Sequence, residues 1–310
     1  MDILRETDFD FLGPKTTGKV RDIYDQGDTL VLITTDRHSS FDRIIAHIPW
    51  KGQVLNQVAA HWFELTKDIV PNHVLAVPDP NVTIARKCKM VPIEAVVRGY
   101  LTGVTDTAIW TRYGQGQRDF GGLRLSDAMR KNQKLPQPIF DPTTKEAAHD
   151  RILSPEQMVA EGFVSKDLFA RIRETALKLF ARGQDIAAQR GLALVDTKYE
   201  FGLDGQGGLV LIDEIHTPDS SRYWQLDSYG TRFAAGEEPD YFDKEFLRLW
   251  FKQHSDPYAD KELPEAPREL VEELSRRYIR MYEQITGASF APGATPTPAR
   301  IERNLQAFAI

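Results

Sequence analysis

The stretch from residue 192 to residue 215 constrains the fold of this chain more than any other part of the sequence. Two runs rich in apolar and β-branched residues, 192–201 and 209–215, flank the glycine-rich segment 202–208. This composition predicts an antiparallel β-hairpin. The hairpin also decides which side chains lie together, because successive side chains of a strand point to opposite faces of the sheet.

Charged side chains share one face of the first strand. The alternation places Asp196, Lys198 and Glu200 on that face, roughly 6.5 to 7 Å from one to the next. The other face holds Val195, Thr197, Tyr199 and Phe201. The second strand adds Asp213 and Glu214, one of which has to point to the charged face.

This charged face has two interpretations. Two or more carboxylates with one ammonium suit Mg²⁺ bound to nucleotide phosphate, because Mg²⁺ takes oxygen ligands, usually including one or two carboxylates. The alternative is a solvated sheet face with cross-strand ion pairs. Against the alternative, a single lysine balances several carboxylates, which costs energy unless a cation is bound.

The rest of the chain predicts strands first and helices later. Short runs of strand-forming residues occupy 29–34, 82–86 and 91–97. Start signals and apolar periodicity predict helices directly after Trp50, from Ser154, from Ser165 to about Gln189, and over 267–286. Residues 112–150 predict a long loop, and the proline-containing tail after Gly287 predicts irregular structure. Strands, an antiparallel hairpin and then helices argue for an α+β fold.

Charge and cysteine content exclude several classes of function. The chain carries 39 basic and 45 acidic side chains, a net charge of −6, so it lacks the positive field of a nucleic-acid-binding protein. It has no apolar stretch of membrane-spanning length and no basic leader, so we expect a cytoplasmic protein without a membrane partner. The single cysteine, Cys88, excludes an intrachain disulfide, and the seven histidines form no zinc motif. Any metal is therefore expected to be held by oxygen.

Three segments offer the local positive charge that an anionic small molecule needs. The loop 217–224 contains hydroxyl groups and Arg222, and Arg98 follows an apolar strand. Arginine binds phosphate or carboxylate through two parallel hydrogen bonds. Residues 16–24 place a glycine and two basic side chains between expected strands, which lets backbone amides approach phosphate. Ordinary turn chemistry is the alternative for the first loop, and the sequence contains no Walker A or Rossmann motif.

Taken in chain order, these segments resemble the phosphoribosylaminoimidazole-succinocarboxamide synthase (SAICAR synthetase) family. Five motifs carry the resemblance, at residues 18–24, 35–42, 91–100, 194–202, and 213–224. Five motifs in order are more specific than any one of them. The predicted C-terminal helices are also typical of the longer members of that family.

The resemblance implies both a fold and a reaction. The fold is α+β, a kinase-like or ATP-grasp-like arrangement of two lobes with antiparallel sheets and C-terminal helices. Residues 1–110 would form a mainly β lobe with a phosphate-covering loop, and residues 111–310 an α+β lobe with the metal and substrate site. The reaction is the ATP-dependent joining of L-aspartate to the carboxylate of carboxyaminoimidazole ribonucleotide (CAIR), which gives SAICAR, ADP and phosphate in purine biosynthesis.

The resemblance also assigns site residues. Nucleotide binding falls to Gly18, Lys19 and Arg21 of the phosphate-covering loop, and to Lys87, Met90 and Lys198. Mg²⁺ is assigned to Glu200 and Asp213, and Asp196 is a candidate base. The phosphate of CAIR is assigned to Arg98, Ser221 and Arg222. The segment 141–150 also resembles the family and is expected to close over substrate.

The sequence departs from the family pattern after Gly103. Members of the family commonly have a serine at the next position, where this chain has Val104. Thr105 or Thr107 would then supply the missing hydroxyl.

Two rival functions remain open from the sequence. One is an ATP-dependent enzyme of kinase-like or ATP-grasp type that acts on another small acid, and the other is a nucleotide-binding regulatory module without turnover. Arg98 and the 217–224 loop favour CAIR over a generic kinase substrate. The complete set of Asp196, Lys198, Glu200 and Asp213 favours turnover. Monomer and homodimer are both left open.

Overall fold

The computed structural model describes residues 2–41, 43–145, 151–241 and 245–307, and the chain forms two compact units. Unit 1 comprises Met1–Phe63, His73–Lys87 and Phe242–Ile310, and unit 2 comprises Glu64–Asn72 and Cys88–Tyr241. This division differs from the expected boundary at residue 110. The strand after Lys87 pairs inside the unit 2 sheet, and the chain returns to unit 1 for its last helices.

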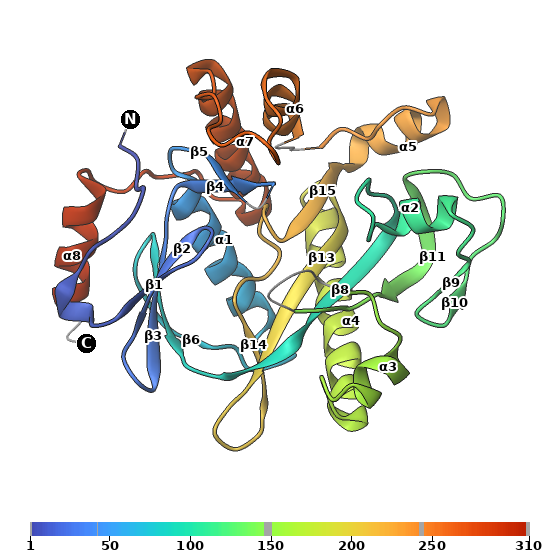
Figure 1. The fold of residues 1–310 in the computed structure, drawn as a ribbon, viewed down its shortest axis with the longest axis horizontal. Coiled ribbons are helices and arrows are strands. Elements are labelled where there is room, and N and C mark those ends of the chain that lie inside the picture. Colours follow the sequence, from blue (N-terminus) through green and yellow to red (C-terminus); the bar gives the residue numbers. More distant parts are fainter. Residues whose placement is uncertain (1, 42, 146–150, 242–244, 308–310) are drawn as a thin grey trace. The chain divides into compact units, whose positions relative to one another are not determined.

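Unit 1 is built on a five-stranded antiparallel sheet (Figure 1). In sheet order its strands are β1 (Lys15–Thr17), β2 (Arg21–Asp25), β3 (Thr29–Thr34), β7 (Val82–Arg86) and β6 (Val74–Asp79). The strands predicted at 29–34 and 82–86 are confirmed. The short helix η1 (Asp10–Leu12) precedes β1, and β4 (Arg37–Ser40) pairs with β5 (Arg43–His47).

Helices complete unit 1. The helix predicted after Trp50 is α1 (Lys51–Thr66), whose apolar stripe is buried. It is followed in this unit by α6 (Glu245–His254), α7 (Arg268–Thr286) and α8 (Thr297–Ala307). Gly287 ends α7 in the left-handed conformation (φ 73°), as its sequence predicts.

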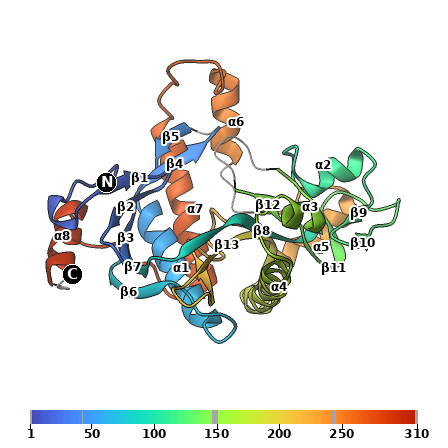
Figure 2. The ribbon, with the colours of Figure 1, turned by 60° about the horizontal axis from the view of Figure 1, so that its bottom comes forward.

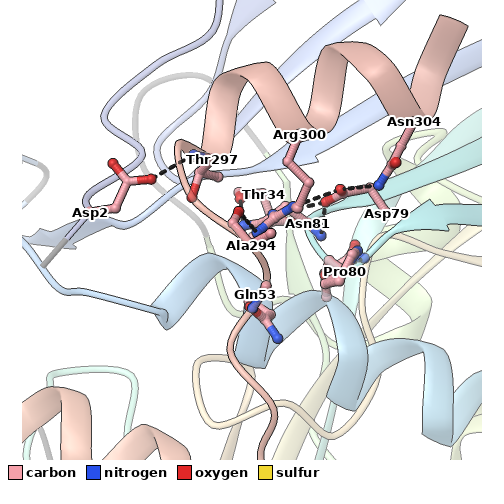
Figure 3. Close-up of polar contacts among 12 residues, drawn as sticks. Asp2, Thr34, Gln53, Asp79, Pro80, Asn81, Ala294, Thr297, Arg300 and Asn304 are labelled. Atoms are coloured by element: carbon pink, nitrogen blue, oxygen red, sulfur yellow. Dashed lines mark hydrogen bonds and ion pairs between the residues drawn. The ribbon is translucent and has the colours of Figure 1, made fainter.

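The prediction of irregular structure for the tail after Gly287 is confirmed for residues 288–296 and was wrong for α8. Its prolines precede or begin α8, where a helix tolerates them. The helix is fixed by Arg300, whose guanidinium forms two hydrogen bonds with the Asp79 carboxylate at 2.8 and 3.0 Å (Figure 3). The same guanidinium donates to Asn81 at 2.6 Å, and Asn304 donates to Asp79 at 2.8 Å. This polar cluster attaches the last helix of the chain to the turn between β6 and β7.

Unit 2 contains a second antiparallel sheet, with the predicted hairpin inside it. The sheet order is β11 (Gln133–Phe140), β8 (Lys89–Leu101), β13 (Leu192–Leu203) and β14 (Leu209–Ile212). Two further strands pair with this path, β12 (Thr143–Thr144) with β8 and β15 (Ser221–Gln225) with β13. The hairpin of β13 and β14 is confirmed, and β8 is longer than the predicted strand 91–97.

The prediction that residues 112–150 form one long loop was wrong for β11. Pro136 and Pro138 interrupt its pairing with β8, and the register shifts between Lys134 and Ile139. Proline has no N–H to donate, so it is tolerated at an edge strand or a bulge. The same region contains the end of α2 (Ile109–Gly114) and the short strands β9 (Asp119–Phe120) and β10 (Leu123–Arg124). Residues 146–150 lie outside the described residues.

One long helix covers one face of this sheet (Figure 2). It is α4 (Lys166–Gln189), which confirms the helix predicted from Ser165 to about Gln189 and is capped by the Ser165 side chain. A side chain at Gly99 of β8 would contact Phe180 of α4, so the glycine permits close packing there. The predicted start at Ser154 is also confirmed, as a complete capping box before α3 (Pro155–Ala160). After β15 the unit ends with α5 (Leu226–Ala235).

A β-bulge in β13 changes the expected alternation of its side chains. The register with β15 shifts between Leu194 and Asp196. Val195 packs with Tyr100 and Trp224 in a buried cluster, whereas Leu194 lies close to Gly183 of α4. The expected separation of faces therefore holds from Asp196 to Glu200 and fails before Asp196.

Among the described residues, no helix is long and apolar enough to cross a membrane.

Candidate active site

The predicted row of charges lies on the face of the unit 2 sheet that points away from α4. Gly99 faces α4, so its neighbour Arg98 points to the other face. Asp196 pairs in register with Arg98 on one side and with Arg222 on the other. Residues directly opposite on neighbouring strands share a face. Three strands therefore bring these charges together on one surface.

An acidic cluster around one lysine occupies one end of this row. Glu200 pairs in register with Glu94 of β8. The Lys198 ammonium donates to Oε1 of Glu94 at 2.7 Å and to Oε1 of Glu200 at 3.1 Å. Lys145, just after β12, donates to Oε2 of Glu200. We call Glu94, Lys145, Lys198, Glu200 and Asp213 the acidic cluster.

The charge of Lys198 is strongly favoured in this cluster. Burial by itself would lower the pKa of this lysine. This effect of burial is outweighed by three nearby carboxylates, which raise the pKa of Lys198 above its usual value: those of Glu200, Glu94 and Asp213. Lys198 is therefore a permanent cation at neutral pH, suited to stabilising negative charge on a phosphoryl group.

Asp213 reaches this cluster in a way that strand alternation did not predict. The strand β14 ends at Ile212, so Asp213 and Glu214 are not strand residues. Asp213 has a left-handed backbone (φ 68°), which aspartate tolerates better than most residues. Its charge acts on Lys198, whereas Glu214 accepts a hydrogen bond from Thr217.

Guanidinium groups occupy the other end of the row. Arg98 donates through Nε to the Asp141 carboxylate at 2.6 Å, and Arg112 of α2 donates to the same oxygen. All three side chains are about nine-tenths buried. Two guanidinium groups sharing one carboxylate leave a buried net positive charge. More exposed, Arg222 lies 3.3 Å from Asp196 and close to Gly103.

Ser221 is not brought into this row. Its hydroxyl donates to Thr197 at 2.8 Å, and both residues are buried. Thr197 alternates with Asp196 and Lys198, so the Ser221 hydroxyl lies on the other side of the strand from Arg222.

The donor set of the acidic cluster fits Mg²⁺ in a complex with nucleotide. Within the described ranges, no group of three or more His, Cys, Asp and Glu side chains is arranged to hold a metal. Mg²⁺ bound to nucleotide needs only one or two carboxylates, because phosphate and water provide the other ligands. The cluster meets that requirement with Glu200, whose side chain is 7% exposed, together with Asp213 and the facing Glu94.

The remaining nucleotide-binding candidates lie mainly in unit 1. Gly18 and Lys19 form the turn between β1 and β2, and Arg21 begins β2. Arg37 donates to the carbonyl oxygens of Gly18 (3.1 Å) and Lys19 (3.4 Å) and so anchors this turn. Lys87 is exposed and donates to Asp25 at 2.6 Å. In unit 2, Met90 is 46% exposed on β8.

Sequence reasoning missed several members of both ends of the row. Glu94 stands in the apolar strand 91–97, and a carboxylate in such a run was a usable signal. Arg112 lies in the region without periodicity, so only the three-dimensional structure brings it to the site. The resemblance placed segment 141–150 over substrate, but only the structure singles out Asp141 and Lys145 within it.

Comparisons with known proteins identify the family. The SAICAR synthetase family model matches residues 15–264. A phosphoribosylaminoimidazole-succinocarboxamide synthase from Legionella pneumophila is 56% identical over 98% of this chain and 97% of the relative. A chloroplastic one from Arabidopsis thaliana is 56% identical over 94% of this chain and 72% of the relative.

Solved structures agree with these relatives. A Saccharomyces cerevisiae SAICAR synthase in complex with SAICAR matches 93% of this chain and 100% of its own, with a TM-score of 0.80 and 32% identity. A SAICAR synthetase in complex with ADP matches 90% of this chain and 100% of its own, with a TM-score of 0.68 and 25% identity. By motif, by sequence and by fold, the chain belongs to the SAICAR synthetase family.

Proposed function

We propose that this chain carries out the SAICAR synthetase reaction on the face of the unit 2 sheet that points away from α4. The reaction joins L-aspartate to the carboxylate of CAIR and converts ATP to ADP and phosphate. The observation that carries the proposal is the row itself, with the acidic cluster at one end and buried guanidinium groups at the other. A substrate with a reacting carboxylate and a distant phosphate matches that polarity.

The chemistry explains why a lysine and carboxylates stand together. A carboxylate is a poor electrophile, so ATP transfers its γ-phosphoryl group to the CAIR carboxylate and ADP leaves. The aspartate amine then attacks the acyl phosphate, an amide bond forms and phosphate leaves. Lys198 offsets negative charge on the transferring group, and Asp196 is our candidate to accept the proton that the amine loses.

Glu200 and Asp213 are our proposed Mg²⁺ ligands. The bound metal would neutralise charge on the nucleotide phosphates. The buried carboxylate of Glu200 and its neighbour Glu94 support a cation at this end of the row.

Arg98 and Arg222 are our proposed partners of the CAIR phosphate. They flank Asp196 in register, on the same face of the sheet. The shared carboxylate of Asp141 leaves positive charge to spare at Arg98. Ser221 is a weaker candidate than the sequence suggested, since its hydroxyl donates to Thr197. Thr105 and Thr107 remain candidates for the hydroxyl that Val104 does not provide.

For the nucleotide, we retain Gly18, Lys19, Arg21 and Lys87 of unit 1 and Met90 and Lys198 of unit 2 as proposed contacts. The support comes from relatives, because a SAICAR synthetase similar to this chain has been solved with ADP. A cytoplasmic location remains a prediction from the sequence.

A coupled ADP-release assay tests the function. Purified protein with ATP, Mg²⁺ and CAIR should release ADP at a sustained rate only when L-aspartate is added. Release with CAIR and a different amino acid would change the assigned substrate. No release under any combination would favour a regulatory module, and release without CAIR would favour another small acid as substrate.

A further inference from the structure

Lys145 holds an unusual place in the acidic cluster. It stands just after the two-residue strand β12, and its backbone N–H donates to the carbonyl of Pro92 at 3.1 Å. Its side chain is 34% exposed, whereas the Glu200 side chain that it contacts is 7% exposed. A partly exposed ammonium thus pairs with a buried carboxylate.

The carboxylate oxygens of Glu200 and Glu94 all have donors in this structure. Oε1 of Glu200 accepts from Lys198, and Oε2 accepts from Lys145. On Glu94, Oε1 accepts from Lys198, and Oε2 accepts from Thr143 at 3.3 Å. A divalent cation that binds Glu200 would therefore meet an ammonium at either oxygen, and two cations repel each other at such range.

Lys145 is the more easily displaced of the two ammonium groups. Lys198 lies on the central strand β13 and bridges two carboxylates. Among the described residues, the Lys145 side chain pairs with Glu200 alone, and Lys145 follows the much shorter strand β12. Moving Lys145 therefore breaks one ion pair, and moving Lys198 breaks two.

We propose that Lys145 is a displaceable counter-ion that occupies Glu200 until Mg²⁺ arrives with the nucleotide. The proposal deepens the proposed function and rests on its assignment of Glu200 to the metal. Lys145 weakens the binding of Mg²⁺ alone, because the metal has to break the ion pair first. Metal that enters with ATP gains phosphate ligands as well and overcomes this cost. The pair thereby couples metal entry to nucleotide entry.

The experiment measures binding of Mn²⁺, used as a spectroscopic substitute for Mg²⁺, without nucleotide or turnover. Free Mn²⁺ is followed by electron paramagnetic resonance during titration of each protein. Lys145→Met is expected to gain affinity and to bind Mn²⁺ about five- to tenfold more tightly than the parent chain. Such a gain equals about 1 to 1.4 kcal/mol. Lys145→Arg keeps the cation and should bind Mn²⁺ as weakly as the parent.

Two controls keep the outcomes distinguishable. Lys131→Met removes a lysine of similar exposure from an ion pair with Glu238 in the same unit, and should leave Mn²⁺ affinity unchanged. Glu200→Gln in the Lys145→Met background should abolish the gain. If Lys145→Met binds no more tightly while Glu200→Gln weakens Mn²⁺ binding in the parent chain, the counter-ion role is wrong and the metal assignment stands. If Glu200→Gln changes nothing in either background, the metal assignment itself fails.

Discussion

Two clusters of charged side chains, one in each unit, differ in how completely their charges are balanced. In unit 1, Arg300 and Asp79 pair through two hydrogen bonds, and their side chains are 6% and 0% exposed. Asn81 and Asn304 satisfy further hydrogen-bonding groups of the pair. In unit 2, the acidic cluster gathers three carboxylates about two lysines that are each about one-third exposed.

The difference separates a structural ion pair from a functional one. When the protein itself neutralises and hydrogen-bonds both groups of a buried ion pair, a bound ligand would not stabilise the pair further. Removing one partner of such a pair leaves an uncompensated buried charge. A cluster with excess charge on an accessible sheet face is stabilised further by an ion or substrate. We therefore expect substitutions in the first cluster to change the free energy of unfolding, and substitutions in the second to change turnover.

The largest expected effect is that of Arg300→Ala on folding. It leaves the buried Asp79 carboxylate without its cation, which costs about 3 to 5 kcal/mol. Denaturant unfolding followed by circular dichroism measures the loss, and the ADP-release rate of the remaining folded protein should stay near that of the parent. Lys178→Ala, which removes an exposed pair with Glu174 on α4, is the control and should leave stability unchanged. A variant that folds normally but loses turnover would place Arg300 among the functional residues and break the comparison.

Glu200→Gln should show the opposite profile. Loss of the carboxylate removes a proposed metal ligand and a partner of Lys198, so turnover is expected to fall by about 10²- to 10³-fold. Asp213→Asn should act in the same direction. Glu238→Gln, which changes the ion pair with Lys131, serves as the control in the same unit. Steady-state kinetics at saturating Mg²⁺ and ATP measure the loss, and full turnover in both variants would overturn the metal assignment.

Arg222→Lys should affect one substrate only. Lysine keeps the positive charge but cannot make two parallel hydrogen bonds, a loss of about 1.5 to 3 kcal/mol when a charged hydrogen bond goes unmade. The KM for CAIR should rise at least about tenfold, with the KM for ATP nearly unchanged. The reverse pattern would move Arg222 to the nucleotide site.

The smallest expected effect is a pH dependence that originates in unit 2. His216 is buried beside Tyr199, and burial lowers its pKa from 6.5 to about 3. The unfolded chain binds the proton of His216 more tightly than the folded protein does. Protonation therefore favours unfolding, and the free energy of unfolding falls progressively as the pH falls from 6.5 toward 3. Between pH 7 and pH 5 the loss is about 2 kcal/mol.

Comparison with His216→Gln isolates this contribution. Unfolding free energies of the parent and the variant at pH 7 and pH 5 should differ in their pH response by that amount, with the parent more acid-sensitive. Equal responses would show that His216 is protonated in the folded protein as readily as in the unfolded chain.

Local sequence signals predicted much of the secondary structure. The capping box at Ser154, the cap at Ser165 and the stop at Gly287 are short-range features, so the helices they delimit appear where expected. The strand β11 was missed because its prolines are tolerated only at an edge strand, a position that depends on the rest of the sheet. Helix α8 was missed because it is stabilised by the contact of Arg300 with Asp79, which is far away in the sequence and gives no local signal.

The site divides in the same way. Strand alternation placed Asp196, Lys198 and Glu200 on one face, and their hydrogen bonds and register agree. The prediction that Asp213 or Glu214 reaches this face agrees with the effect of Asp213 on Lys198, but strand alternation is not the reason, since β14 ends one residue earlier. Asp141 and Lys145 lie in segment 141–150, which the resemblance placed over substrate without assigning single residues. Arg112 comes from a segment without periodicity, so no local pattern assigns it to the site.

The three-segment construction of unit 1 has a consequence for protein synthesis. Asp79 and Arg300 are separated by 221 residues, and a ribosome that adds about 5 to 20 residues per second takes roughly 10 to 45 s to cover that distance. Most of unit 2 is one continuous segment, Cys88–Tyr241, and emerges within that interval. We therefore expect unit 2 to become protease-resistant on the ribosome first. Until α8 has been synthesised, the Asp79 carboxylate in the sheet of unit 1 lacks the guanidinium that neutralises it.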